Sequence, residues 1–139
     1  VMEYQAATTI HASPELLWDL LTDAAQYPEW NPTVVRVDGT IAKGNKITVV
    51  ATVSPERTFP VTVTELVPRE RMVWQGGMPL GLFRGVRTFT LAPATNGATT
   101  FNMHEVFSGP LLGLIRRSMP DLQPSFDEFA RSLKLRAEG

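Results

Sequence analysis

The chain contains no cysteine among its 139 residues. Disulfide bonds, thiolate nucleophiles and sulfur-ligated metals are therefore excluded, and a reducing compartment is favoured. The chain has two histidines, His11 and His104, which stand far apart and without the HExxH spacing of a zinc-binding helix. We therefore predict that the protein holds no metal ion.

Other motifs are missing as well. The sequence has no GxSxG turn for a serine nucleophile, no GxxxxGK[ST] loop for phosphates and no GxGxxG segment that opens a helix. We therefore predict no cofactor. No apolar run approaches the roughly 18 residues of a membrane span, and the first ten residues lack the charged-then-apolar order of an export signal. These absences favour a cytoplasmic protein without stable membrane insertion.

Charge is not concentrated in a way that indicates nucleic-acid binding. The formal net charge is −1, charged residues make up 19% of the chain, and hydrophobic residues make up 43%, which is typical of a globular protein. The longest cationic cluster, Arg116 and Arg117, is interpreted as a solvated helix face, with contact to a membrane or an anionic partner as the less favoured alternative. The length predicts one domain over residues 1–139.

Most of the chain up to Ser108 has the pattern of strands and turns. A β-rich segment from Glu3 to Ile10 precedes Ser13, which can cap a helix that starts at Pro14 and ends near Thr22 to Ala24. Two prolines in residues 26–32 limit the next segment to a short helical turn. Six more strands are predicted over residues 34–40, 46–54, 58–67, 71–75, 82–92 and 99–107. Short turns between them favour antiparallel neighbours in sequence order.

The last third of the chain carries an apolar stripe with alternating spacings of four and three residues. It consists of Ile115, Met119, Leu122, Phe126, Phe129 and Leu133, and it predicts a long amphipathic helix that covers the sheet and runs to about Ala137. Pro120 and Pro124 fall inside this helix and predict a bend or break near Ser118 to Pro120. We favour a helix that starts at Pro120 after a shorter helical turn. A helix across a curved sheet can enclose a pocket.

The last two strands show a clean alternation that assigns their faces. Matching the apolar sets pairs Leu91 with Phe101, Phe89 with Met103, and Arg87 with Glu105, because a slip of one residue would turn apolar side chains into water. An Arg and a Glu would then point together into an apolar interior. This pair is interpreted as a structural ion pair at the wet end of the sheet, as a polar anchor in a ligand cavity, or, least favoured, as an acid–base group. His104 faces the opposite side.

Several segments together resemble the START-like or SRPBCC superfamily, which includes polyketide cyclase/dehydrase-type proteins. The resemblance rests on Ile10–Glu15 with Leu17-Trp18, Tyr27–Pro32, Val63–Pro68 with Met72–Trp74, Glu105–Gly109, and Phe126–Lys134. It implies an α+β helix-grip fold. In that fold a curved antiparallel sheet of about seven strands wraps a long C-terminal helix, and two short helices follow the first strand.

The resemblance also implies a cavity between sheet and helix for a small hydrophobic or amphipathic molecule, lipid-like or polyketide-like. Positions expected near it are Trp30, Trp74, Arg87, Phe89, Met103, Glu105 and Phe126; the residue pattern adds Phe107 and Leu122. We favour a noncatalytic binding protein. The alternatives are a cyclase, dehydrase or aromatase with Glu105 and Arg87 as candidate catalytic residues, and a protein-interaction module similar to the chaperone-activating branch. A homodimer is compatible with each.

Overall fold

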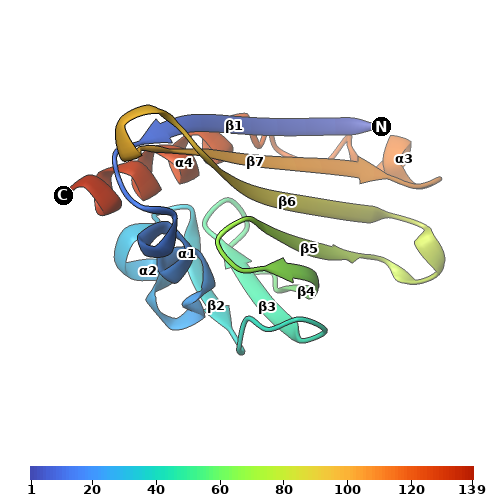
Figure 1. Cartoon of the computed structure of the whole chain (residues 1–139). Helices are drawn as coiled ribbons and strands as arrows, with labels where there is room; N and C mark the ends of the chain where they lie inside the picture. Colours follow the sequence, from blue (N-terminus) through green and yellow to red (C-terminus); the bar gives the residue numbers. More distant parts are fainter.

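A computed structural model describes residues 1–139 (Figure 1). The strands are β1 (Met2–Ile10), β2 (Val34–Asp38), β3 (Lys46–Ala51), β4 (Phe59–Val67), β5 (Arg71–Gly77), β6 (Arg84–Pro93) and β7 (Thr99–Ser108). The α-helices are α1 (Pro14–Thr22), α2 (Tyr27–Trp30), α3 (Leu112–Ile115) and α4 (Gln123–Glu138). Three 3-10 turns, η1 (Ala24–Gln26), η2 (Pro79–Gly81) and η3 (Thr95–Gly97), complete the chain.

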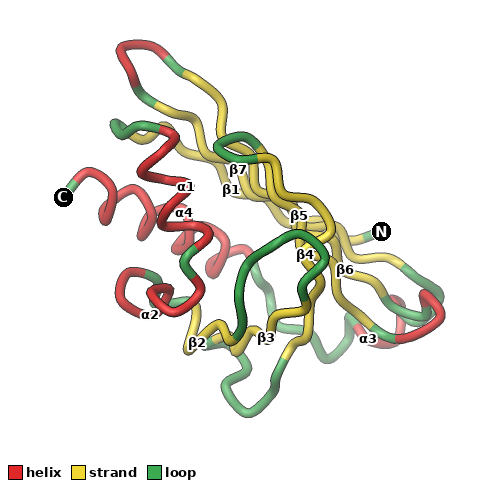
Figure 2. Tube along the Cα trace, turned by 60° about the horizontal axis from the view of Figure 1, so that its bottom comes forward, coloured by secondary structure: helices red, strands yellow, loops and turns green.

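The seven strands form one antiparallel sheet in the order β1-β7-β6-β5-β4-β3-β2. Strands β2 to β7 are neighbours in sequence order, because short turns join each to the next. β1 pairs with β7 and closes the other edge. The sheet is curved, and α1, α2 and α4 lie on its concave side (Figures 1 and 2). The predicted curved antiparallel sheet with a C-terminal helix is confirmed.

The two short helices after β1 form where the sequence predicts them. The side chain of Ser13 accepts a hydrogen bond from the Leu16 backbone N–H at 3.2 Å, and Pro14 begins α1, where no donor is lost. α1 buries Leu17 and Leu21 completely. In α2, the buried rings of Tyr27 and Trp30 face the core.

The C-terminal helix differs from the prediction. It begins at Gln123 rather than at Pro120, and neither proline interrupts it. Pro124 lies in the first turn of α4, where its missing N–H has no helical partner in any case. Pro120 lies in the nonhelical segment between α3 and α4, since a proline disfavours helical geometry in the residue before it. Ile115, Met119 and Leu122 therefore precede α4.

Two side chains attach α4 along the free edge of β1. Gln123 Nε2 donates to the Gln5 carbonyl at 2.7 Å, and Lys134 Nζ donates to the Thr9 carbonyl at 2.7 Å. The helix therefore covers the half of the concave face that lies toward the end of β1. The start of β1 and the end of β7 extend beyond it toward α3 (Figure 1).

Aromatic rings fill the space between α4 and the sheet. Phe129 of α4 packs with four rings from three other elements, α2, β6 and β7; its centroid lies 6.1 Å from that of Phe101 in a stacked pair, and 5.9 Å from that of Phe89. Trp74 and Phe89 pack edge to face at 4.9 Å. All four side chains are buried. This part of the concave face is therefore a packed core.

Candidate functional site

An ion pair lies on the concave face beside this core. The register of β6 and β7 is the predicted one, with Leu91 opposite Phe101, Phe89 opposite Met103, and Arg87 opposite Glu105. Arg87 Nε donates to Glu105 Oε1 at 2.8 Å. The side chains are 24% and 13% exposed, respectively. The pair is thus largely shielded from water and still accessible to it.

Aromatic groups surround this pair. The guanidinium carbon of Arg87 lies 4.8 Å from the ring centroid of Phe126 on α4, which is a cation–π distance. Trp74 of β5 lies directly opposite Arg87 in the sheet, and Tyr4 of β1 lies directly opposite Glu105. The charged pair is therefore held against apolar side chains of the sheet and of α4.

Gly85 makes room for this arrangement. A Cβ atom at this position would lie 3.0 Å from Glu105 Oε2 and 3.0 Å from the ring of Phe107, closer than nine in ten real contacts of a Cβ atom. Any larger residue would push the carboxylate or the ring away. The missing side chain thus leaves room for Oε2 of Glu105 and the ring of Phe107 close to the backbone of β6.

Tyr27 lies at the other end of the site. Burial raises the pKa of its phenol well above the ordinary value of 10, and the positive charge of Arg87 opposes this rise only in part. Its hydroxyl donates to the Leu21 carbonyl at 2.6 Å. Tyr27 is therefore a neutral hydrogen-bond donor that holds α2 against α1, and its proton is not available for acid–base chemistry near neutral pH.

The structure divides the nine predicted site residues into two groups. The first group lies in or against the packed core and consists of Trp30, Trp74, Arg87, Phe89, Met103, Glu105 and Phe126. The second lies toward the uncovered end of the concave face. There Phe107 is buried and stacks on Phe83 with centroids 5.7 Å apart, while Leu122, half-buried just before α4, also packs against the core.

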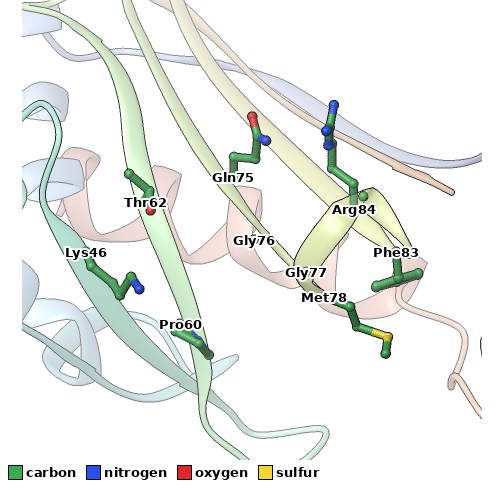
Figure 3. Close-up of a pocket in the computed structure, with 10 residues that line it drawn as sticks. Lys46, Pro60, Thr62, Gln75, Gly76, Gly77, Met78, Phe83 and Arg84 are labelled. Carbon is green, nitrogen blue, oxygen red and sulfur yellow. The ribbon is translucent and has the colours of Figure 1, made fainter.

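The two main hollows of the molecule lie elsewhere. One, of about 250 Å³, lies at the ends of β4 and β5 and includes Lys46, Thr62, Gln75 and Arg84 (Figure 3). The other, of about 320 Å³, lies between β1 and α4 beside Ala6–Thr8. None of the nine predicted residues lines either hollow. Between α4 and the sheet, where we expected vacant space, the aromatic rings are packed together.

Three buried donors near the core have no hydrogen-bond partner. They are Trp30 Nε1, Trp74 Nε1 and Asn31 Nδ2. Asn31 was not among the predicted residues; its Oδ1 accepts from the backbone and hydroxyl of Thr33 at 3.0 and 2.7 Å, which leaves its N–H₂ group unused. Unpaired buried donors are rare in proteins and call for an explanation. Two of the three, Trp30 and Asn31, belong to the segment Tyr27-Pro28-Glu29-Trp30-Asn31-Pro32.

A curved seven-stranded antiparallel sheet on a C-terminal helix, with two short helices after the first strand, defines a START-like helix-grip protein. Residues 2–138 match the family described as polyketide cyclase/dehydrase and lipid transport. The chain belongs to that family.

Solved structures support the same fold. A hypothetical protein from Helicobacter pylori has a TM-score of 0.79 at 11% identity, with 98% of this chain and 88% of that chain covered. A START superfamily protein from Mycobacterium smegmatis has a TM-score of 0.71 at 15% identity, with 98% and 97% covered. The di-domain ARO/CYC protein BexL from the BE-7585A biosynthetic pathway has a TM-score of 0.71 at 18% identity. The match covers 97% of this chain and 46% of that chain. No curated protein shows significant sequence similarity.

Proposed function

We propose that this protein binds a small hydrophobic or amphipathic molecule, lipid-like or polyketide-like, on the concave side of its sheet. The observation that carries the proposal is the Arg87–Glu105 pair, which is turned onto an aromatic face and remains partly accessible. An ion pair in such a place adds little net stability compared with apolar residues of similar size. A polar anchor for a ligand is a reason to keep it.

The pair has unused hydrogen-bonding capacity for a ligand. Only Nε of Arg87 and Oε1 of Glu105 are engaged with each other, so the remaining guanidinium nitrogens and Oε2 can bind a polar group. The rings of Phe126 and Phe107 supply apolar contact on either side. A ligand would place its polar end at the pair and its apolar body against these rings.

Binding requires movement of the aromatic side chains. The rings of Trp30 and Trp74 are buried, and their indole N–H groups have no partner. A ligand oxygen that enters between them would satisfy donors that are costly to leave unpaired. We therefore expect a ligand that carries at least one carbonyl or hydroxyl oxygen.

The ligand experiment compares two arginines that have the same ion-pair geometry. Arg87→Ala removes the proposed anchor, and Arg36→Ala removes an exposed pair in which Arg36 Nε lies 2.8 Å from Asp38 Oδ2. Titration with a fluorescent fatty acid should show about tenfold weaker binding for Arg87→Ala, since a charge-assisted hydrogen bond is lost. Glu105→Gln should bind the anionic probe at least as well as the unchanged protein. Equal affinity in both arginine variants would contradict the proposal.

A second candidate function is a cyclase- or dehydrase-type enzyme. The chain's family is described partly by that chemistry, and the paired Arg87 and Glu105 are ionisable groups held against aromatic residues of the concave face. In that case Glu105→Gln would abolish turnover of a poly-β-keto thioester and leave its binding intact. Native mass spectrometry of protein purified without denaturant would identify a bound molecule and so help to choose between the two functions.

Three expectations stay predictions. They are the single domain over residues 1–139, the cytoplasmic location and the homodimer. Light scattering on the purified protein measures the last of these directly.

A further inference from the structure

Two segments far apart in the sequence meet at the end of the molecule opposite α1 and α2. The Leu111 backbone N–H donates to the Leu82 carbonyl at 3.0 Å, and a Cβ at Gly109 would lie 2.6 Å from the same oxygen. The β5–β6 connection and α3 both lie at this end of the molecule (Figures 1 and 2). We call residues 78–84 and 109–117 the tip.

Large apolar side chains project from the tip into solvent. Leu80 is 96% exposed, Leu114 is 67% exposed and Met78 is 43% exposed. Leu80 also has a φ of +63°, a left-handed conformation that residues other than glycine, asparagine and aspartate seldom adopt. An apolar side chain would ordinarily pack in the core. The strained turn instead holds the Leu80 side chain in solvent.

The charged side chains of the tip itself have one sign. Arg84, Arg116 and Arg117 are exposed and take part in no ion pair. No aspartate or glutamate occurs between Glu70 and Glu105, or between Glu105 and Asp121. The chain as a whole has a net charge of −1, so the tip is a local positive region on a nearly neutral protein.

We propose that the tip docks onto the surface of an anionic lipid bilayer. Exposed leucines beside unpaired arginines match the two parts of such a surface, because the leucines enter the acyl boundary and the arginines meet the negative headgroups. Each signal alone gives weak binding, and together they reinforce each other. None of the helices combines the length and the apolar character that a bilayer span requires.

The position of the tip connects it to the concave face. Phe83, within the tip, stacks on Phe107 of the uncovered end of the sheet. Docking at the tip would therefore bring that end close to the bilayer, where an amphipathic molecule could enter or leave. This last step rests on the proposed function, whereas docking itself does not.

Sedimentation with lipid vesicles tests the proposal. The full chain should bind vesicles that contain one quarter phosphatidylglycerol and should bind pure phosphatidylcholine vesicles much more weakly. Leu80→Ser with Leu114→Ser, and separately Arg116→Gln with Arg117→Gln, should each weaken binding about tenfold. Leu135→Ser and Arg136→Gln, which change exposed residues at the far end of α4, should leave it unchanged. Raising the salt concentration should release the protein.

Three results would overturn docking. The first is equal binding to neutral and anionic vesicles. The second is a loss of binding in the α4 control variants that is as large as the loss in the tip variants. The third is that the protein binds no vesicles and forms a dimer that dissociates in Leu80→Ser. Circular dichroism verifies that each variant is folded. Fatty-acid binding, measured without vesicles, reports separately on the proposed function, so failure of either proposal is recognised independently.

Discussion

The two halves of the concave face are formed by the same strands, but only one of them is covered by α4. Under α4, Phe89, Phe101 and Phe129 are no more than 1% exposed and pack ring against ring. Beyond the start of α4, Phe83 packs on Phe107 at the end of β7 and stays partly exposed. Alternation along the strands turns side chains inward in both halves. The place where the helix begins decides which half becomes core and which stays accessible.

The largest expected effect tests the packing under α4. Phe129→Ala should lower the free energy of unfolding by about 3–5 kcal/mol, because it removes a fully buried ring from the centre of the core. Phe83→Ala, at the uncovered end, should cost about 1–2 kcal/mol, since that ring is already partly in water. Urea denaturation of both variants measures the difference. Equal losses would mean that the two halves are packed alike.

The next effect concerns the ion pair between the halves. Arg87→Ala should cost about 2 kcal/mol, less than for a fully buried pair, because the charge it leaves behind on Glu105 is partly hydrated. The double change Arg87→Met with Glu105→Leu should recover most of that loss, because no unpaired charge remains. A double-mutant cycle by urea denaturation measures both. If the double variant were less stable than Arg87→Ala, the pair would be kept for stability rather than for binding.

The smallest expected effect tests the hydrogen bonds that Glu138 makes at the end of α4. The backbone N–H of His11 and the Lys134 ammonium, each hydrogen-bonded to Glu138, lower the pKa of that carboxyl below its usual 4.5. A lowered pKa in the folded state contributes stability above the unfolded-state pKa, and this stability is lost as the pH falls through the folded-state pKa. Glu138→Gln should thus be slightly less stable than the unchanged protein at about pH 7, and the gap should close toward about pH 3. Thermal unfolding at both pH values measures it, and a gap that widens in acid would contradict the assignment.

Much of the fold was predictable because its signals are local. Ser13 and Pro14 mark the start of α1, and the alternation around Arg87 and Glu105 sets their register without further information. Strand ends were less accurate. The strand predicted to run to Ser54 ends at Ala51, and the strand predicted from Leu82 begins at Arg84, since strand ends depend on pairing partners as well as on propensity.

The candidate site was predictable only in part. Pairing identified Arg87 and Glu105 as one unit, and the aromatic residues were correctly assigned to the concave side. Their packing into a closed cluster was not predicted, because apolar periodicity says which face a ring points to and not how much space remains there. The unpaired N–H₂ group of Asn31 was also missed, since the environment of a loop residue depends on what folds over it.

The sequence alone was thus enough to predict the order of the strands, the side chains that point inward, and the pairing of Arg87 with Glu105. These features follow from the two-residue alternation of side chains along a strand and from turns of only a few residues. The residue at which the covering helix α4 begins could not be predicted from such local patterns. Pro120 and Pro124 are compatible with several starting points for this helix. The helix begins at Gln123, whose side chain donates a hydrogen bond to the Gln5 carbonyl of β1, more than a hundred residues away in the sequence. The gathering of Leu80 and Leu114 at one tip likewise depends on contacts that join distant parts of the chain.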